Sequence, residues 1–599
     1  MDEKTAKSLL ESLLSRLEAD ARREIPQYEG VVSGLERKAL AAIVRSLATD
    51  QSRNIAASEI LASDPELAAG RSDSAQHLQT SETISPQEHQ TPSAILMGPR
   101  SQRFKLDETA LSGRTAADGN ILCIDFGTAK SKAFASTLNR DDDEPELHEI
   151  GLGRKDNDID GSAYTVASSV WISDDGLVFA GSEALRRSMD SYHPDAKRKR
   201  LDSLKQHFSH TGTEQKLGNK KLDENTNPTS VDLTYEDVIT FFLAYLTDSA
   251  APDIAIPWSR NVKRRFTIPA WSPSQRSWAG SALARYVARA QLLADTFTGQ
   301  WKEGIPVQEL KRINSEAAQH DETIKYLLDA SEQTATYPQG LLEPLAAGSG
   351  RIWTDKAARN LVFVVDVGAG TTDYSLFWVT QDSRVEKRTA FPILPGGEAI
   401  RMAGDNLDEI LLHEILTKIH GGLNSSMRGN IEVDLRLRGL RRLKEQMFLN
   451  GRLELTLVND QSVSINAEEF LQHEQVKGLG REIEKAITRF FNSVHPSWGS
   501  ALERALIVLT GGGANLPMIK DLQKAVWEIG GSKLVFKPAR EVPEFVADTF
   551  DAAFQREYSQ LAVAIGGALP ILNEKDMLNQ WQGGAHTPGS LQRFPTKGV

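Results

Sequence analysis

Apolar positions follow two different periods along this chain, and the change of period predicts which segments form strands and which form helices. Residues 121–134 (ILCIDFGTAKSKAF) and 362–377 (VFVVDVGAGTTDYSLF) are apolar runs that an aspartate, glycines and threonines interrupt before the apolar pattern resumes. This pattern is typical of two strands joined by a small-residue turn. Between such runs the apolar residues take helical spacing, as in YEDVITFFLAYLTD. The alternation predicts an α/β fold built around mixed sheets.

The same patterns divide the chain into regions. Leucines at helical spacing, among them Leu10, Leu13 and Leu17, predict a helical hairpin over residues 1–69. Residues 70–118 are rich in Ser, Gln, Thr, His and Pro, which predicts a flexible linker. The remaining regions are a first α/β region, 119–360, a second one, 361–572, and a tail, 573–599. The tail is too short and too rich in Gly and Pro to form another domain.

Composition narrows the class of protein. Of 599 residues, 40% are hydrophobic and 25% are charged, which is typical of a globular protein. The net charge of -12 argues against a general nucleic-acid binder, and we interpret the basic run KRKR at 197–200 as a solvated loop. No run of about 18 apolar residues occurs, so the sequence indicates neither a signal peptide nor a membrane span. The single cysteine, Cys123, excludes an intrachain disulfide framework, and we expect a buried thiol in a cytoplasmic protein.

The turns of the two interrupted runs contain the residue types that bind phosphate. Their glycines allow a ligand to approach the backbone, whose N–H groups bind anions, and their threonines add hydroxyl donors. Asp125 and Asp366 end the first strand of each run and would repel a bare phosphate, so we expect a hydrated Mg²⁺ between them. Each run alone is also compatible with an ordinary hairpin, but two copies with aspartate at the same point favour a binding site. Lys130 and Lys132 follow the first turn, either to reach a phosphate or as ordinary strand-edge lysines.

A third stretch, ALIVLTGGGANLPMIKDLQKAV, ends at Val526 and predicts a buried strand, a triple-glycine turn and a helix. In this order the three stretches resemble the phosphate-1, phosphate-2 and adenosine motifs of the actin/Hsp70/sugar-kinase ATPase superfamily, and most of all the Hsp70 nucleotide-binding domain. The resemblance covers residues 119–572. It implies a two-lobed actin-like ATPase fold of duplicated ribonuclease H-like lobes, preceded by a small N-terminal helical segment. Lobe I would be 119–360, and lobe II would be 361–572, including a return to lobe I.

The resemblance also implies roles for individual residues around Mg²⁺ and ATP. Asp125 and Asp366 would hold the metal through water, and Lys205 would neutralise charge on the transferred phosphoryl group. Glu343 and Asp373 would orient the attacking water. The phosphates would be cradled by Gly127, Thr128, Gly368, Ala369, Gly370 and Thr371. The adenosine would be bound by Lys444, Gly511, Gly512, Gly513 and Asn515, the last matching an arginine that stacks on adenine in the family.

The chain also departs from the Hsp70 pattern. Ala129 replaces a phosphate-binding threonine, Ala369 replaces a glycine, and Glu445 stands where the family has a second basic residue. The sequence ends soon after the ATPase-like region, so we expect no peptide-binding domain. We therefore expect slow ATP hydrolysis that acts as a conformational switch for a protein partner, read through the N-terminal helices. The alternatives are an actin-like filament-forming protein, a nucleotide-bound scaffold without hydrolysis and, with less support, a small-molecule kinase.

Overall fold

The structure is a computed structural model, and its secondary structure divides the chain into described and undescribed stretches. The described residues are 103–112, 120–137, 145–156, 162–191, 198–210, 214–255, 262–328, 340–354, 359–381, 388–419, 425–496, 498, 505–569 and 573–574. The predicted helical hairpin, most of the predicted linker and the tail after residue 574 lie outside them. Apart from Ala255, the described residues belong to one compact unit that comprises Gln102–Ile254 and Arg260–Val599.

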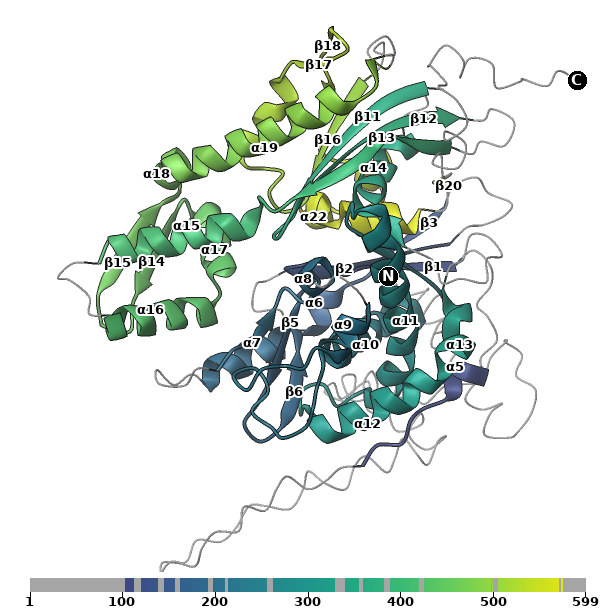
Figure 1. The fold of residues 1–599 in the computed structure, drawn as a ribbon, viewed down its shortest axis with the longest axis vertical. Coiled ribbons are helices and arrows are strands. Elements are labelled where there is room, and N and C mark those ends of the chain that lie inside the picture. The colour runs from purple at the N-terminus through teal and green to yellow at the C-terminus, as the bar shows by residue number, and fades with distance from the viewer. Residues whose placement is uncertain are drawn as a thin grey trace, which may run out of the picture. The chain divides into compact units, whose positions relative to one another are not determined.

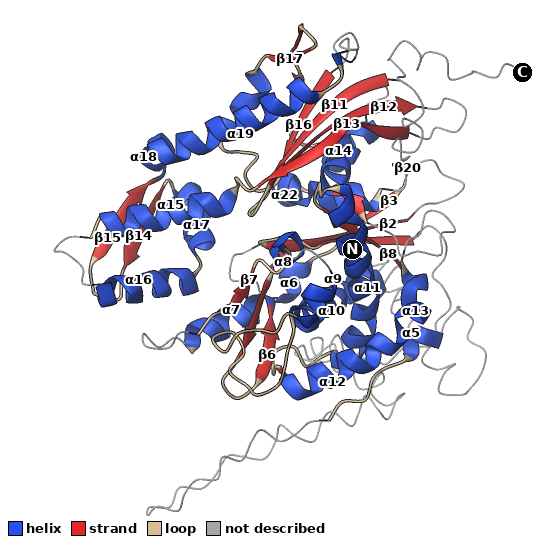
Figure 2. Cartoon of the chain, viewed as in Figure 1, coloured by secondary structure: helices blue, strands red, loops and turns tan. Residues whose placement is uncertain are grey.

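Two six-stranded mixed sheets form the centre of this unit (Figure 2). The first has the order β10-β8-β1-β2-β3, with β4 paired to β2, and the second has the order β19-β16-β11-β12-β13-β20. The strands of the first sheet are β1 Asn120–Asp125, β2 Lys130–Thr137, β3 Glu146–Glu149, β4 Thr165–Ala167, β8 Lys263–Ile268 and β10 Leu341–Leu342. Those of the second are β11 Arg359–Val367, β12 Thr372–Gln381, β13 Arg388–Ile400, β16 Ala505–Thr510, β19 Lys537–Pro538 and β20 Asn573–Glu574.

The two sheets place their central hairpins in equivalent surroundings. In the first, β1 pairs antiparallel with β2 and parallel with β8. In the second, β11 pairs antiparallel with β12 and parallel with β16. Both interrupted runs of the sequence are therefore β-hairpins, as predicted. The register sets Asp125 opposite Lys132 in one hairpin and Asp366 opposite Asp373 in the other, each pair at the turn end.

Two helices, α14 (Glu343–Thr354) and α22 (Ala552–Ala568), pack against each other and against both sheets (Figure 1). Two glycines of α22 make this packing possible. A Cβ on Gly566 would lie 1.8 Å from the carbonyl oxygen of Ala346, and one on Gly567 would lie 2.4 Å from Cys123 Sγ. Cys123 is buried and has a free thiol, as the sequence indicates.

A smaller sheet and a helical cluster accompany the first central sheet. The small sheet has the order β7-β5-β6-β9, from Leu201–Asp202, Ser169–Ile172, Leu177–Ala180 and Ile305–Pro306. The helices are α6 Leu152–Asp156, α7 Gly181–Asp190, α8 Gln206–His210, α9 Glu214–Asn219, α10 Tyr235–Ala255, α11 Pro273–Phe297, α12 Val307–Ala317 and α13 Asp321–Ile324. A buried guanidinium ties three of them together, because Arg289 of α11 bonds to Glu236 of α10 and to Asp321 of α13.

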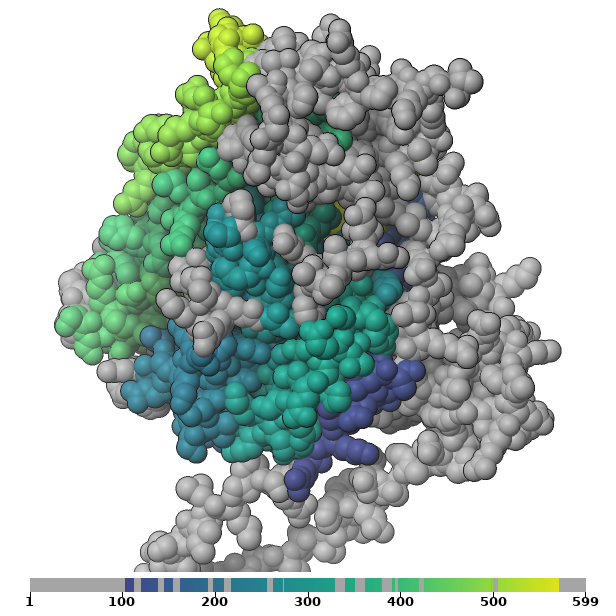
Figure 3. Space-filling view, turned by 45° about the vertical axis from the view of Figure 1, so that its right-hand side comes forward, coloured from purple at the N-terminus to yellow at the C-terminus, as the bar shows by residue number. Residues whose placement is uncertain are grey.

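Residues 103–112, which the sequence assigns to the predicted linker, pack on this helical cluster. The backbone N–H of Phe104 donates to Glu309 at 2.9 Å, and its ring contacts Phe297 edge to face. Helix α5 (Thr109–Ser112) follows. Figure 3 shows this purple segment lying against the teal surface that contains α12. Apolar contacts of this kind hold residues 103–112 on the helices, although the polar composition of the region predicts a flexible linker.

Helix α19 packs against the second central sheet, and the aromatic core there includes Phe363, Tyr374, Phe490 and Phe491. The elements around it are α15 Gly404–Thr417, α16 Ser425–Arg438, α17 Leu440–Asn450, β14 Arg452–Thr456, β15 Ser462–Asn466, α18 Ala467–Gln472, α19 Glu474–Ser493, α20 Pro517–Lys520, β17 Trp527–Ile529, β18 Ser532–Leu534 and α21 Glu544–Thr549. Among the described helices, none combines the length and apolar character needed to span a membrane.

Candidate functional site

A cavity of about 180 Å³ opens where the turns of the two central hairpins approach each other. Fourteen of the sixteen residues to which the sequence assigns a binding or catalytic role line this cavity. They are Asp125, Gly127, Thr128, Lys205, Glu343, Asp366, Gly368, Ala369, Thr371, Asp373, Lys444, Gly511, Gly512 and Gly513. Gly370 and Asn515 do not line it: a Cβ on Gly370 would meet Gln206 and Thr128, and Asn515 is exposed.

On the side of the first hairpin, Asp125 is held by two donors. Lys132 Nζ lies 3.1 Å from its Oδ2, and the hydroxyl of Thr267 donates to its Oδ1 at 3.1 Å. The first contact follows from the register, because Lys132 is the cross-strand partner of Asp125. Thr267 belongs to β8, the parallel neighbour of β1. Asp125 is thereby fixed at the carboxyl end of its strand with its charge balanced by an ammonium group.

On the side of the second hairpin, two buried aspartates face the cavity. Burial, reinforced by the neighbouring Asp373, raises the pKa of Asp366 to about 7. Burial also raises the pKa of Asp373, although hydrogen bonds to its charged form oppose this. These bonds come from the hydroxyl of Thr371 at 2.6 Å and from the backbone N–H of Ala270 at 2.9 Å. Asp373 is therefore fixed in orientation by one donor on each oxygen.

Lys205 donates a hydrogen bond to Glu343, and both side chains are buried between these two sides. Burial raises the pKa of Glu343 to about 8, the carboxylates of Asp125 and Asp373 add to the rise, and Lys205 opposes it. Burial alone would lower the pKa of Lys205, but the surrounding carboxylates outweigh it and raise that pKa. Lys205 therefore remains protonated, and Glu343 retains a proton more readily than an exposed glutamate does.

The inner end of the cavity suits a hydrated cation. Asp125, Glu343, Asp366 and Asp373 line it together with Lys132 and Lys205, so the carboxylates outnumber the ammonium groups by two. Within the described residues, no three His, Cys, Asp or Glu side chains are placed to hold a metal ion directly. Mg²⁺ keeps several of its waters in proteins and is often bound through one or two carboxylates. The set therefore fits a divalent cation held through water.

The turn of the second hairpin is braced by the start of α15. The N–H of Gly404 donates to the carbonyl of Gly368 at 3.2 Å, and the N–H of Asp405 donates to the carbonyl of Ala369 at 2.7 Å. The triple-glycine turn lies against the same hairpin, because the N–H of Gly513 donates to the carbonyl of Val367 at 3.0 Å. These backbone contacts fix the path of both turns beside the cavity.

Helix α17 forms the outer wall of the cavity, and two of its charged side chains there are paired within the chain. Lys444 donates to the carbonyl of Gly404 at 2.7 Å and pairs with Asp408 at 2.6 Å, so its ammonium group is engaged by α15. Glu445 accepts from Lys130 Nζ at 3.0 Å, which links α17 to the start of β2 across the cavity. Phe448 also lines this wall. Position 445, where the resemblance implies a second basic residue, thus carries the acidic partner of an ion pair.

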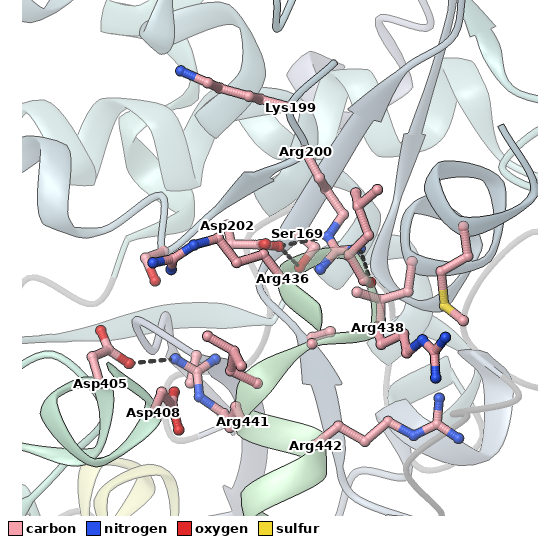
Figure 4. A pocket seen from close by; sticks show the side chains of 18 of the residues that line it. Ser169, Lys199, Arg200, Asp202, Asp405, Asp408, Arg436, Arg438, Arg441 and Arg442 are labelled. Atoms are coloured by element: carbon pink, nitrogen blue, oxygen red, sulfur yellow. Dashed lines mark hydrogen bonds and ion pairs between the residues drawn. The ribbon is translucent and has the colours of Figure 1, made fainter. Parts of the chain in front are cut away.

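A second cavity, of about 490 Å³, adjoins the first and shares Ala129, Lys130 and Arg441 with it (Figure 4). Arginines from the segment before β7 and from α16 and α17 surround it. They are mostly neutralised by neighbours: Arg436 bonds to Glu409, Arg441 to Asp405, and the buried Arg200 to Asp202. Arg200 also donates to the carbonyl of Leu437 of α16. The predicted solvated loop at KRKR is therefore wrong for Arg200, because this guanidinium satisfies carboxylate and backbone acceptors in the interior.

Several lining residues were given no role by the sequence. Gly404, Leu407, Arg441, Gln560 and Val563 line the cavity without belonging to any of the three motifs. Most of them lie on helices that reach the cavity only through tertiary packing. Only Gly404, which follows an apolar strand and opens a helix, carries a local signal for close backbone approach.

Comparison with known proteins gives a distant and partial likeness. The chain is 26% identical over 184 residues to the "Chaperone protein HscA homolog" of Burkholderia ambifaria (strain MC40-6), Burkholderia cenocepacia (strain HI2424) and Burkholderia multivorans (strain ATCC 17616 / 249). HscA is a chaperone of the Hsp70 family. The match covers 30% of this chain and 27% of each relative. No protein-family model matches the chain.

Proposed function

We propose that this protein binds Mg·ATP in the cavity between the two hairpins and hydrolyses it slowly, as a conformational switch for a protein partner. The observation that carries the proposal is the convergence of Asp125, Glu343, Asp366, Asp373 and Lys205 on one cavity beside glycine-rich turns. Carboxylates for a cation, an ammonium group and exposed backbone N–H groups are the components that phosphoryl transfer needs. The likeness to HscA homologues is consistent with an Hsp70-like ATPase. Lobes I and II would be 119–360 and 361–572.

In this proposal Asp125 and Asp366 hold hydrated Mg²⁺, which supplies charge neutralisation to the phosphates when it is bound. Gly127, Thr128, Ala369 and Gly370 receive the phosphate oxygens, while the N–H of Gly368 donates to the carbonyl of Thr371 and closes the turn. The ammonium group of Lys205 lies at the inner end of the cavity, where it stabilises negative charge on the transferred phosphoryl group. Its pairing with Glu343 holds the ammonium there before the ligand arrives.

Glu343 and Asp373 orient the attacking water. Asp373 has one hydrogen-bond donor on each oxygen, from Thr371 and Ala270, which fixes the direction of its remaining lone pairs. Burial raises the pKa of both carboxyls, and it raises that of Glu343 to about 8, so Glu343 can accept and keep a proton near neutral pH. Ala129 contributes no hydroxyl where the family has a threonine, which we expect to keep hydrolysis slow.

Steady-state phosphate release tests the hydrolytic part of this proposal. Lys205→Ala and Asp366→Asn should each lower the rate by about 100-fold or more, because the first removes a positive charge that stabilises the transition state and the second removes a carboxylate that holds the cation. Lys311→Met is the control, since Lys311 forms an ion pair with Asp237 outside the cavity. If the Lys205 and Asp366 variants hydrolyse ATP as fast as the wild type, this cavity is not the catalytic site.

A second candidate is a nucleotide-bound scaffold without hydrolysis. Lys444 already pairs with Asp408 and donates to the carbonyl of Gly404, which favours this candidate. A side chain held in this way is less able to form new contacts with the nucleotide during hydrolysis. Tight ATP binding to the wild type with no phosphate release above that of Lys205→Ala would support the scaffold.

A further inference from the structure

Lys132 occupies a place in the cavity that the proposed function does not use. It follows Lys130 by two positions on β2, so the two side chains project from the same face of the strand. Lys130 reaches outward to Glu445 of α17, whereas Lys132 reaches inward to Asp125. The side chain of Lys132 is only 16% exposed. A long cationic side chain that is buried in this way needs a partner of opposite charge, and Asp125 is that partner.

The ammonium group of Lys132 lies beside the first phosphate-type turn. A Cβ built on Gly127 would be 3.5 Å from Lys132 Nζ, so the charge adjoins the backbone that would receive a phosphate. Its influence also extends to the second hairpin. Burial raises the pKa of Asp366, and Lys132 is the leading group that opposes this rise. The charge of Lys132 therefore acts on both aspartates that would flank a cation.

This placement changes what a phosphate group meets in the cavity. Two facing aspartates would repel a phosphate unless a cation lay between them. With Lys132 at 3.1 Å from Asp125, a positive charge is already present on that side, and it belongs to the chain. The second ammonium, on Lys205, is hydrogen-bonded to Glu343, whereas Lys132 is in direct contact with Asp125.

We propose that Lys132 is a built-in cation of this cavity, which lets the protein bind nucleoside di- and triphosphates with only a modest dependence on divalent metal. The proposal rests on the proposed function, because it concerns the same nucleotide cavity. An ammonium-to-phosphate hydrogen bond is charge-assisted, and such bonds typically change affinity by about 10- to 100-fold. Lys132 therefore contributes to the affinity for the phosphates, to which the divalent cation would otherwise be the sole contributor.

Equilibrium binding of ADP, with Mg²⁺ and with EDTA in its place, tests the role of Lys132. The measured quantity is the ratio of the two dissociation constants. Wild type should show a ratio below about 10, whereas Lys132→Met should show one about 10- to 100-fold larger. Lys132→Arg keeps the charge and should stay near the wild-type ratio. Lys311→Met is the matched control, because Lys311 also pairs with a buried aspartate, Asp237, at 2.8 Å but outside the cavity.

The outcomes separate this inference from the proposed function. Equal ratios for wild type and Lys132→Met overturn the inference and leave nucleotide binding intact. Failure of the wild type to bind ADP or ATP even with Mg²⁺ overturns the proposed function, and the inference with it. If Lys132→Met does not fold, the wild-type ratio decides, since a loss of affinity in EDTA above about 100-fold contradicts a built-in cation.

Discussion

Asp366 shows how burial in the cavity couples charge to stability. Its carboxyl has a pKa of about 7 in the folded protein, whereas an aspartate in an unfolded chain has one near 4. Between these pH values the folded protein keeps a proton that the unfolded chain has released. The free energy of unfolding therefore falls as the pH rises from about 4 to about 7, and this contribution is constant above that range. In the ligand-free protein, the buried Asp366 therefore lowers the free energy of unfolding at neutral pH.

Asp366→Asn should make the ligand-free protein more stable at pH 7.5 by about 1 to 3 kcal/mol and leave it unchanged at pH 4, because asparagine carries no proton to lose. Urea unfolding at the two pH values measures this difference. Asp521→Asn serves as the control, since Asp521 is exposed and lies outside the cavity. An equal gain in stability at both pH values, or no gain at pH 7.5, would show that deprotonation of Asp366 does not destabilise the folded protein.

At the residue scale, the sequence predicted the aspartates at the inner end of the cavity better than the paired side chains at its outer wall. Asp125 and Asp366 follow from a repeated strand and turn, which is a local pattern. The pairing of Lys444 with Asp408 and of Lys130 with Glu445 depends on how helices pack after folding, and no local pattern encodes it. Such partners decide whether a side chain at the wall is available to a ligand.

At the scale of elements, the triple-glycine turn contains one position that only glycine suits. Gly511 has φ of 84°, and a Cβ there would lie 2.3 Å from Asp366 Oδ1 and 2.4 Å from the carbonyl oxygen of Val367. A Cβ on Gly512 would have no heavy atom within 4 Å. The same turn therefore provides both a sensitive position and its control.

Gly511→Ala should destabilise the protein by about 2 kcal/mol or more, because it combines backbone strain with a clash against the end of β11. Gly512→Ala should change stability by less than about 0.5 kcal/mol. Urea unfolding of both variants measures the difference, and similar values for the two would contradict the close packing of β16 against β11.

The elements themselves were predicted to different degrees. Both hairpins were evident from alternation and turn residues, which act over a few positions. Their parallel neighbours β8 and β16 and the helices α14 and α22 come from distant parts of the chain, so their places required the tertiary structure. Residues 103–112 pack on α11 and α12 although their composition resembles the linker, because a few apolar contacts are enough to hold a short segment.

For the whole molecule, the switch and the filament-forming alternative make opposite predictions about assembly. A switch that acts on a partner needs no self-association, so we expect the full chain to remain in the supernatant after high-speed sedimentation with ATP, with ADP or without nucleotide. Lys205→Ala is the control for effects of hydrolysis. A pellet that forms only with ATP would favour filaments.

The central claim is that the cavity between the two hairpins binds Mg·ATP, and calorimetric titration of the full chain tests it most directly. We predict one site per chain, with affinity reduced at least about 10-fold in Asp125→Asn, which removes a charge from the cation-binding side of the cavity. Lys311→Met should bind as the wild type does. An absence of binding at millimolar ATP, or binding that Asp125→Asn leaves unchanged, would contradict the account.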